Sequence, residues 1–222
     1  MIFAAAFALA AANLHAGGFH ANCEARLART EISVDAETAP YVTISALGTD
    51  ELTARNPSGA PSERTLGLTI AHYMSAVDFE QNGIRDPDTH EYCMRPHFRV
   101  RLSYAPIEVY VGREIQTGSC PYLEAVAHEE KHVAAYDAQL RKAAETMERE
   151  MRAYYRDTVF YGNSGELEAQ LAYSVKHLWL PLAQKQLEAV EATQQAIDTP
   201  QEYARYRAAC NGEVNRILNG MR

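Results

Sequence analysis

A stretch of helical periodicity from about residue 120 to residue 155 constrains the fold of this chain more than any other feature. Gly118-Ser119-Cys120-Pro121 precedes it, and a proline near the first helical position is typical of a helix start. Apolar residues then recur every three or four positions to about Tyr155, and Gly162–Gly165 breaks the pattern. The sequence therefore predicts a single helix of about ten turns.

Two more helices are expected after this break. Ser164 is a suitable N-cap for the second helix, and Pro181 should kink that helix because proline has no amide hydrogen to donate. Thr199-Pro200-Gln201-Glu202 fits a capping box with proline at the first helical position, and it should open the third helix. The chain after residue 116 is thus expected to be helical.

The chain before residue 116 alternates apolar and polar residues, as half-buried strands do. Phe98–Tyr104 and Ile107–Val111 both alternate, with a turn signal at Ala105-Pro106 between them, so we predict a hairpin. Two weaker strand candidates are Val42–Ile44 and Leu66–Ile70. Loops are expected at Asn56–Ser62 and Asn82–Asp88, and residues 70–80 fit either helix or strand. The pattern as a whole predicts an α+β fold, with a small antiparallel sheet in the N-terminal half followed by a helical half.

The first sixteen residues have the character of a secretory signal peptide. An apolar run from Met1 to Ala12 is followed by Asn13–Ala16, and we expect cleavage after Ala12 or Ala16. The run is too short to span a bilayer, and no later stretch is long and apolar enough to do so. Residues 17–222 should then form one domain, with a strand-rich part at 17–116 and a helical part at 117–222.

The cysteines agree with export from the cytoplasm. An even number of cysteines in an exported chain favours disulfides, and none of the four has the C-x-x-C spacing of a zinc site. Three pairings are compatible with the sequence, and we favour Cys23–Cys93 together with Cys120–Cys210. The second of these bonds would tie the long helix to the C-terminal region.

The long helix carries the motif H-E-x-x-H at His128–His132. Four residues span about one helical turn, so both imidazoles project from one side and can bind one zinc ion. The pair flanks the apolar stripe and Glu129 points into it, where an unpaired carboxylate would be costly unless a cation or a water lies beside it. We therefore predict His128 and His132 as zinc ligands and Glu129 as the general base of a zinc hydrolase. A helix with chance His and Glu is the alternative.

Catalytic zinc usually takes a third protein ligand, which the motif does not supply. A third histidine ten residues after the first is absent because that position is Ala138, and Asp137 faces away from the pair. On the second helix Glu168 falls on the core side, so we predict Glu168 as the third ligand, with Glu166 and His177 in reserve. A Glu168 paired with an arginine is the alternative.

Composition and spacing exclude other functions. The formal net charge is −8 at pH 7 and no Lys/Arg cluster occurs, so nucleic acid is not expected as a partner. Glu129-x-x-His132 also fits a di-iron bundle, but that site needs a second E-x-x-H, which the sequence lacks. A peptide or protein substrate is expected, and a strand near Ile107–Val111 is a candidate to pair with it. Tyr154, Tyr161 and Tyr173 are candidates to stabilise the oxyanion.

The segment Val109–Val133 resembles zincin metallopeptidases, in which a strand, a short link and an H-E-x-x-H helix form the core. More narrowly, residues 93–140 resemble bacterial predicted secreted zinc-dependent proteases, in which a Cys-containing turn precedes an H-E-x-x-H-V helix. The resemblance implies a zincin-like domain in a periplasmic or secreted protein, with the zinc ligands and general base named above. It does not place the third ligand, since Ala172 follows Glu168 where an E-x-x-x-D motif has its acid.

Two other functions remain open at this point. The protein could be a non-catalytic periplasmic zinc-binding or interaction protein that uses the same residues. The same zinc chemistry could also hydrolyse a non-peptide bond, such as a cell-wall amide.

Overall fold

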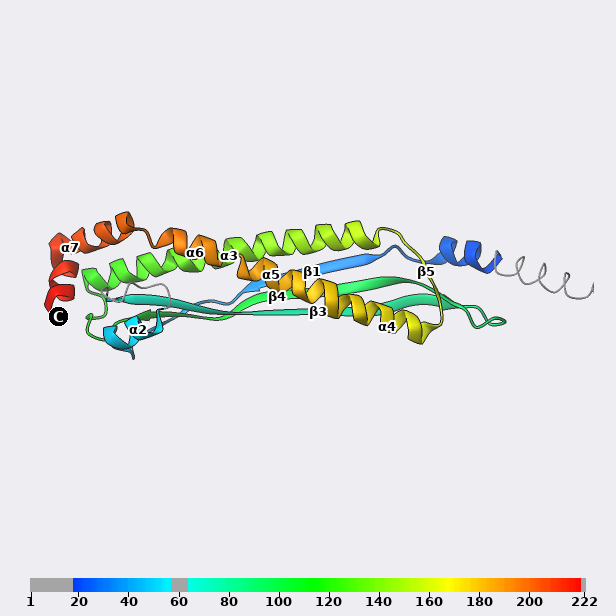
Figure 1. Ribbon diagram of the computed structural model, residues 1–222, viewed down its shortest axis with the longest axis horizontal. Coiled ribbons are helices and arrows are strands. Elements are labelled where there is room, and N and C mark those ends of the chain that lie inside the picture. Colours follow the sequence, from blue (N-terminus) through cyan, green and yellow to red (C-terminus); the bar gives the residue numbers. More distant parts are fainter. Residues whose placement is uncertain (1–17, 57–63, 221–222) are drawn as a thin grey trace, which may run out of the picture. The chain divides into compact units, whose positions relative to one another are not determined.

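The structure is a computed structural model that describes residues 18–56 and 64–220 (Figure 1). The signal peptide expected at residues 1–16 and most of the loop expected at Asn56–Ser62 lie outside the described residues. In chain order the elements after a helix at residues 18–26 are β1 (Glu31–Thr38), β2 (Val42–Ile44), α2 (Thr49–Arg55), β3 (Gly67–Arg85), β4 (Tyr92–Val111), α3 (Cys120–Tyr155), β5 (Phe160–Gly162), α4 (Ser164–Ser174), the π-helix η1 (Val175–Trp179), α5 (Leu180–Glu188), α6 (Glu191–Ile197) and α7 (Pro200–Gly220). The predicted α+β class is confirmed.

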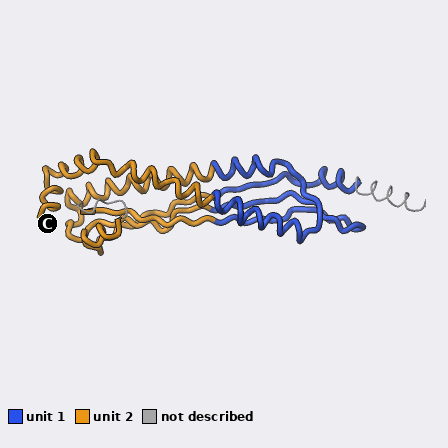
Figure 2. The backbone as a smooth tube through the Cα atoms, in the orientation of Figure 1, with its two compact units in different colours: residues 1–35, 76–101, 146–182 blue, residues 36–75, 102–145, 183–222 orange. Residues whose placement is uncertain are grey.

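The chain forms two compact units, each assembled from three segments (Figure 2). Unit 1 comprises residues 1–35, 76–101 and 146–182, and unit 2 comprises residues 36–75, 102–145 and 183–222. Neither unit coincides with the strand-rich part 17–116 or the helical part 117–222, because each combines strands with helices that cover apolar faces. The single domain over 17–222 stays a prediction.

β4 is the strand with which each of the other described strands pairs. β2 joins it in parallel, with Val42 opposite Glu108 and Ile44 opposite Tyr110, and β5 joins it antiparallel. The sheet is therefore mixed, whereas the alternation pattern predicts a purely antiparallel one. Strand direction depends on where the chain re-enters the sheet, which alternation does not encode.

The hairpin predicted at Ala105-Pro106 is wrong. Tyr92–Val111 is one continuous strand with a cis Ala105–Pro106 bond inside it. The buried positions shift by one across this bond, from the even-numbered Leu102 and Tyr104 to the odd-numbered Ile107 and Val109. A break in the two-residue period is common to turns and to irregularities within one strand, so the pattern alone does not separate them.

β4 instead pairs with β3, the strand before it. β3 contains residues 70–80, which fitted helix or strand equally, and pairing with β4 settles them as strand. The connection is also shorter than the loop predicted at Asn82–Asp88, because β3 continues to Arg85. Asp86 then forms the turn, and its carboxylate accepts the amide hydrogens of Asp88 and Thr89.

The long helix α3 forms as predicted, from Cys120 to Tyr155. Ser119 caps its first turn, since its hydroxyl accepts the Tyr122 amide hydrogen at 3.4 Å. Both predicted disulfides are confirmed. Cys120–Cys210 joins the first turn of α3 to α7 within unit 2, and Cys23–Cys93 lies within unit 1.

The later helices begin where the sequence predicts, with local differences. Asn163 rather than Ser164 caps α4, because the Asn163 side chain accepts the Gly165 amide hydrogen. The kink predicted at Pro181 stays a prediction. The residues before Pro181 form the π-helix η1, in which the Leu180 amide reaches back five residues to the Val175 carbonyl. α7 begins at Pro200, with its first turn capped by Thr199.

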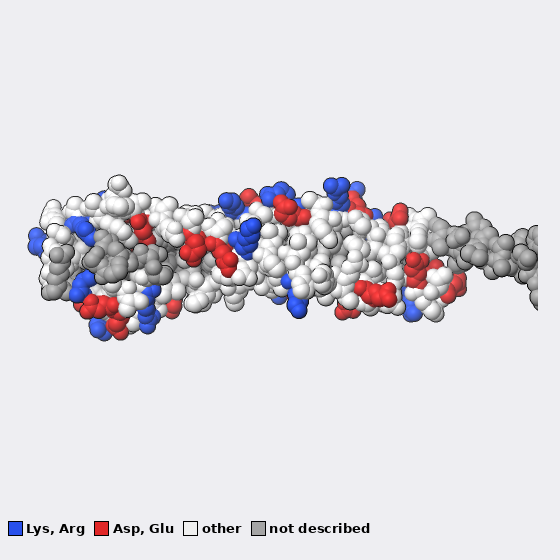
Figure 3. Space-filling view, in the orientation of Figure 1, with Lys and Arg blue, Asp and Glu red and all other residues white. Residues whose placement is uncertain are grey.

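The described surface is charged and mixed. On the face shown in Figure 3, basic side chains are interspersed with acidic ones. Exposed ion pairs among the described residues include Arg101–Asp78 and Arg152–Glu148. Among the described residues no helix is long and apolar enough to cross a membrane.

Candidate metal centre

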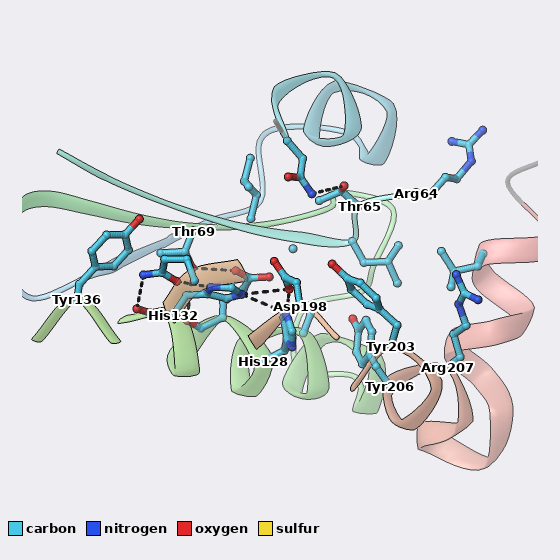
Figure 4. Close-up of a pocket in the computed structure, with 18 of the residues that line it drawn as sticks. Arg64, Thr65, Thr69, His128, His132, Tyr136, Asp198, Tyr203, Tyr206 and Arg207 are labelled. Carbon is cyan, nitrogen blue, oxygen red and sulfur yellow. Dashed lines mark hydrogen bonds and ion pairs between the residues drawn. The ribbon is translucent and has the colours of Figure 1, made fainter. Parts of the chain in front are cut away.

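The three motif residues of α3 lie in unit 2 and are almost fully buried. His128, Glu129 and His132 are 6%, 4% and 7% exposed. They line a cavity of about 190 Å³, whose other walls come from the start of β3, from α6 and from α7 (Figure 4). All of the residues that line this cavity belong to unit 2. The helix thus presents its H-E-x-x-H face to this cavity.

Asp198 lies beside the two histidines and completes a triangle of atoms of the kinds that bind metal ions. It follows the last residue of α6, two residues before α7 begins. Its Oδ1 is 3.1 Å from His128 Nε2 and 3.4 Å from His132 Nε2, and the two Nε2 atoms are 3.4 Å apart. Two ligands of one tetrahedral zinc ion, each about 2.0–2.1 Å from the metal, lie about 3.4 Å from each other. The three atoms therefore have the spacing of one face of a zinc tetrahedron.

The other ring nitrogen of each histidine is held by an oxygen. His128 Nδ1 lies 3.4 Å from Glu202 Oε1, and His132 Nδ1 lies 2.5 Å from Gln194 Oε1. Gln194 also donates its side-chain amide to the His132 carbonyl at 3.2 Å, which fixes the direction of its oxygen. An acceptor at Nδ1 places the proton there and leaves the Nε2 lone pair facing Asp198. Both imidazoles are thus oriented as metal ligands commonly are.

Glu202 has a second role besides holding His128. Its carboxylate also contacts Lys131 and, at 2.8 Å, Arg205. The capping box predicted at Thr199–Glu202 would have two hydrogen bonds, and one of them forms: the Thr199 hydroxyl accepts the Glu202 amide hydrogen. The Thr199 amide donates to the Ile197 carbonyl, and the Glu202 carboxylate is directed to the histidine. Glu202 therefore lies in the first turn of α7 and also supports the centre.

The Glu129 side chain is held in place by the strand β3. The Thr69 hydroxyl donates to Glu129 Oε2 at 2.8 Å. A Cβ atom placed on Gly67 would lie 2.5 Å from Glu129 Oε1, so a side chain at this position would displace the carboxylate. β3 and α3 together fix the carboxylate at the cavity wall.

The charges of the centre shift its proton equilibria in opposite directions. Burial raises the pKa of Glu129, although the two histidines act against this. Burial lowers the pKa of His128 and of His132, but the hydrogen bond to Asp198 and the charge of Glu129 outweigh it, so each pKa is raised. The same histidine contacts outweigh burial at Asp198 and lower its pKa. Asp198 therefore stays ionised while protons favour the histidines.

We expect metal binding at this centre to weaken as the pH falls. A protonated imidazole has no lone pair for a metal, and the raised pKa values mean that protons compete at a higher pH than the ordinary histidine value of about 6.5. As the pH is lowered from about 8 to about 5.5, zinc affinity should begin to fall while the pH is still above that value. Competition with a chromophoric chelator measures the affinity. An affinity that is constant across this range would contradict the prediction.

The structure brings Asp198, and not Glu168, to the histidine pair. Glu168 and the reserve Glu166 are exposed on α4 in unit 1, and the reserve His177 is exposed in η1. Asp137 lies on α3 but contacts Thr38 and Arg141. The helical wheel places Glu168 on the core side, whereas the buried face of this helix passes through the apolar residues Leu167, Leu171, Val175 and Trp179.

Asp198 was missed because it lies in the link between two helices, where no periodicity marks a side chain as inward-facing. One local signal was present. Asp198 directly precedes the Thr199-Pro200 helix start, so the beginning of that helix fixes the backbone next to the Asp198 carboxylate. Gln194 and Glu202 lie four residues to either side of Asp198. Glu202 is expected from the sequence only as part of the capping box, and neither residue is expected at the site.

Two other expected contributors lie elsewhere. Tyr154, Tyr161 and Tyr173 belong to unit 1 and do not line the cavity, which Tyr136, Tyr203 and Tyr206 do. The strand Ile107–Val111 is buried within β4, the strand with which each of the other described strands pairs, so it is not free to receive a substrate backbone. The strand that lines the cavity is β3, through Gly67, Leu68 and Thr69.

Comparison of the chain with protein-family models, with curated proteins and with solved structures finds no match. The resemblance to zincin metallopeptidases stays a prediction, and the function proposed below depends on the geometry and chemistry of the described residues.

Proposed function

We propose that the protein is a zinc-dependent hydrolase, and more specifically a peptidase. The observation that carries the proposal is the triangle of His128 Nε2, His132 Nε2 and Asp198 Oδ1, beside the buried carboxylate of Glu129. Two imidazoles and one carboxylate form the three-ligand set of many catalytic zinc sites, which keep a fourth position for water or substrate. Here the triangle borders a cavity that leaves room for that fourth group.

The residues around the triangle fit hydrolysis. A zinc ion held by these ligands supplies Lewis acidity and lowers the pKa of a water molecule. Glu129 accepts the proton of the attacking water and delivers it to the leaving amine. Thr69 keeps the Glu129 carboxylate oriented, and Gln194 and Glu202 keep the imidazoles oriented. The raised pKa of Glu129 suits a group that must gain and then release a proton.

The position of β3 supports a peptide as the substrate. Among the described strands β3 pairs with β4 alone, which leaves its other edge without a strand partner. Gly67–Thr69 of this strand lines the cavity next to Glu129. An extended peptide can add to such an edge through main-chain hydrogen bonds and place one of its amides at the centre. The two disulfides support a periplasmic or secreted location for this activity.

Zinc binding is the first test of the proposal. The purified protein should contain about one zinc per chain, and adding zinc to chelator-treated protein should raise its Tm. At a free zinc concentration 1,000-fold above Kd the stabilisation is about 4 kcal/mol, or roughly 10 °C for a chain of this size. His128→Ala removes one ligand and should abolish the rise. Equal zinc content and equal Tm shifts in both proteins would overturn the proposal.

A further inference from the structure

The cavity at the candidate metal centre has residues on both sides of Asp198, and the two sides differ in charge. Figure 4 shows Tyr136 on one side of Asp198 and both Arg64 and Arg207 on the other. Glu191 also lines the cavity. Burial and the charge of Glu191 raise the pKa of Tyr136, so Glu191 lies near Tyr136. The cavity is therefore acidic on the Tyr136 side and basic on the Arg207 side.

The contacts of the two histidines give the same order of residues. The Tyr203 ring lies near the His128 ring, with centroids 6.3 Å apart. Arg207 follows Tyr203 by four residues, so both lie on the same face of α7. Tyr136 follows His132 by four residues on α3, on the opposite side of the motif from His128. Arg207 thus belongs to the His128 side of the centre, one helical turn beyond Tyr203.

Arg207 also connects this cavity to a second one. A cavity of about 220 Å³ lies beside the first and shares Asp198, Tyr203 and Arg207 with it. Arg207 is itself exposed, so its charge is not balanced against a cost of burial. A ligand group in either cavity is therefore close to a positively charged side chain next to the metal centre.

Other basic residues near the centre serve the protein itself. Lys131 and Arg205 both contact Glu202, and neither lines the cavity. Among the described residues, the Lys/Arg side chains that line it are Arg64 and Arg207. These two come from different segments, one that leads into β3 and one in α7, so the tertiary structure brings both charges to the same side of the centre.

The chemistry of arginine indicates which group is bound there. A guanidinium has a planar set of donors that matches the two oxygens of a carboxylate, and it stays charged at any pH near neutrality. Arg64 pairs with Asp50, an exposed acid outside the cavity, and it adds positive charge on the same side as Arg207. The carboxylates of Glu129 and Glu191 repel an anion from the rest of the cavity. An anionic group of a ligand is therefore directed to Arg207.

We infer that the Arg207 guanidinium binds a carboxylate of the peptide substrate, so that the protein selects peptides with a carboxylate close to the scissile amide. The carboxylate is that of the peptide's C-terminus or that of an Asp or Glu side chain, since both present the same two oxygens. This inference depends on the proposed hydrolase function, for which it names the class of substrate. Arg207 holds the substrate and takes no part in proton transfer.

The first experiment measures peptide binding by the metal-free protein, which does not depend on zinc. The probes are a short acetylated polyalanine peptide with a free C-terminal carboxylate, the same peptide with a C-terminal amide, and an amidated peptide with one alanine replaced by glutamate. Titration calorimetry at neutral pH should show that one or both carboxylate peptides bind about tenfold more tightly than the neutral one. The tighter binder identifies the source of the carboxylate. Equal binding of all three peptides would overturn the inference.

Substitutions of Arg207 test whether this residue causes the preference. Arg207→Gln should remove it, and Arg207→Glu should reverse it in favour of an amidated peptide that contains lysine. Arg216→Gln is the matched control, because Arg216 is also exposed on α7 but does not line the cavity. All three changes are at exposed positions, so the Tm should stay nearly the same. If Arg207→Gln keeps the preference of the parent protein, the inference is wrong.

Salt and kinetics provide readouts that a purely structural role of Arg207 would not change. Raising the ionic strength from about 0.1 M to about 1 M shortens the Debye length from about 10 Å to about 3 Å, so the preference for carboxylate peptides should decrease. With the zinc-loaded protein and a cleavable peptide that carries the carboxylate, Arg207→Gln should raise KM about tenfold and change kcat little. Its zinc content should equal that of the parent. A fall in kcat with KM unchanged would contradict the assigned role.

The outcomes separate this inference from the proposed function. If zinc binds and peptides are cleaved without any preference for a carboxylate, the role of Arg207 is wrong while the hydrolase proposal stands. If the protein does not bind zinc, the hydrolase proposal fails and the assignment of a substrate fails with it. A carboxylate preference that persists in the metal-free protein and is lost in Arg207→Gln would then identify a site that only binds peptides.

Discussion

Asp198→Ala is expected to lower the zinc affinity of the protein by roughly two to three orders of magnitude. Asp198 supplies the only carboxylate within the triangle, at 3.1 Å and 3.4 Å from the two Nε2 atoms. Its removal leaves two neutral imidazoles, which is one ligand fewer than catalytic zinc usually requires. The loss should exceed the 10- to 100-fold effect that is typical of residues that only orient a ligand. Competition with a chromophoric chelator at neutral pH measures it directly.

Glu168→Ala is the matched control for this experiment. Glu168 is an exposed acid on α4, outside the triangle, so its removal should leave zinc affinity and Tm unchanged. The pair of variants therefore decides between the ligand that the helical wheel predicts and the one that lies next to the histidines. A large loss with Glu168→Ala and none with Asp198→Ala would mean that the zinc site differs from the triangle described above.

Glu129→Gln is expected to lower peptide hydrolysis by about 10²- to 10⁴-fold while zinc content stays the same. Glutamine has the shape of glutamate, and its amide oxygen can still accept the Thr69 hydroxyl hydrogen, so the local packing is kept. It cannot accept a proton from water at neutral pH. Because burial raises the pKa of Glu129, removing the charge should leave the free energy of unfolding unchanged or increase it. Cleavage of a quenched fluorescent peptide library reports the rate.

Glu130→Gln provides the control, since it makes the same change at the neighbouring, exposed position, whose carboxylate contacts Tyr41. It should hydrolyse peptides as the parent does. If Glu129→Gln and the parent hydrolyse peptides equally, Glu129 is not the general base. If the parent binds zinc and cleaves no peptide or other amide, the non-catalytic zinc-binding function is favoured instead.

Local patterns were sufficient for the elements whose cause is local. Helix α3 could be predicted because its cap, its apolar period and its termination all lie within its own sequence. The strand alternation of β4 was equally visible, but the shift of the buried face at Ala105-Pro106 was interpreted as a turn. Whether the chain reverses there depends on which strand lies alongside, and that strand is β3, paired through long-range contacts.

The candidate site divides in the same way. His128, Glu129 and His132 could be identified from sequence because one helical turn is enough to bring them together. Asp198, Gln194 and Glu202 are 62 to 74 residues away from their histidine partners, and no periodicity connects them to the motif. The Gly67 backbone beside Glu129 is likewise invisible until β3 and α3 are packed together.

The sequence by itself thus determined an α+β fold, the long helix, the two histidines with the glutamate between them, and the preferred disulfide pairs. Only the tertiary structure decided which carboxylate completes the triangle, which oxygens orient the imidazoles and which tyrosines line the cavity. The physical reason is that a side chain's direction within one helix follows from the backbone repeat. A meeting of α3, β3 and the α6–α7 link depends instead on how their apolar faces pack.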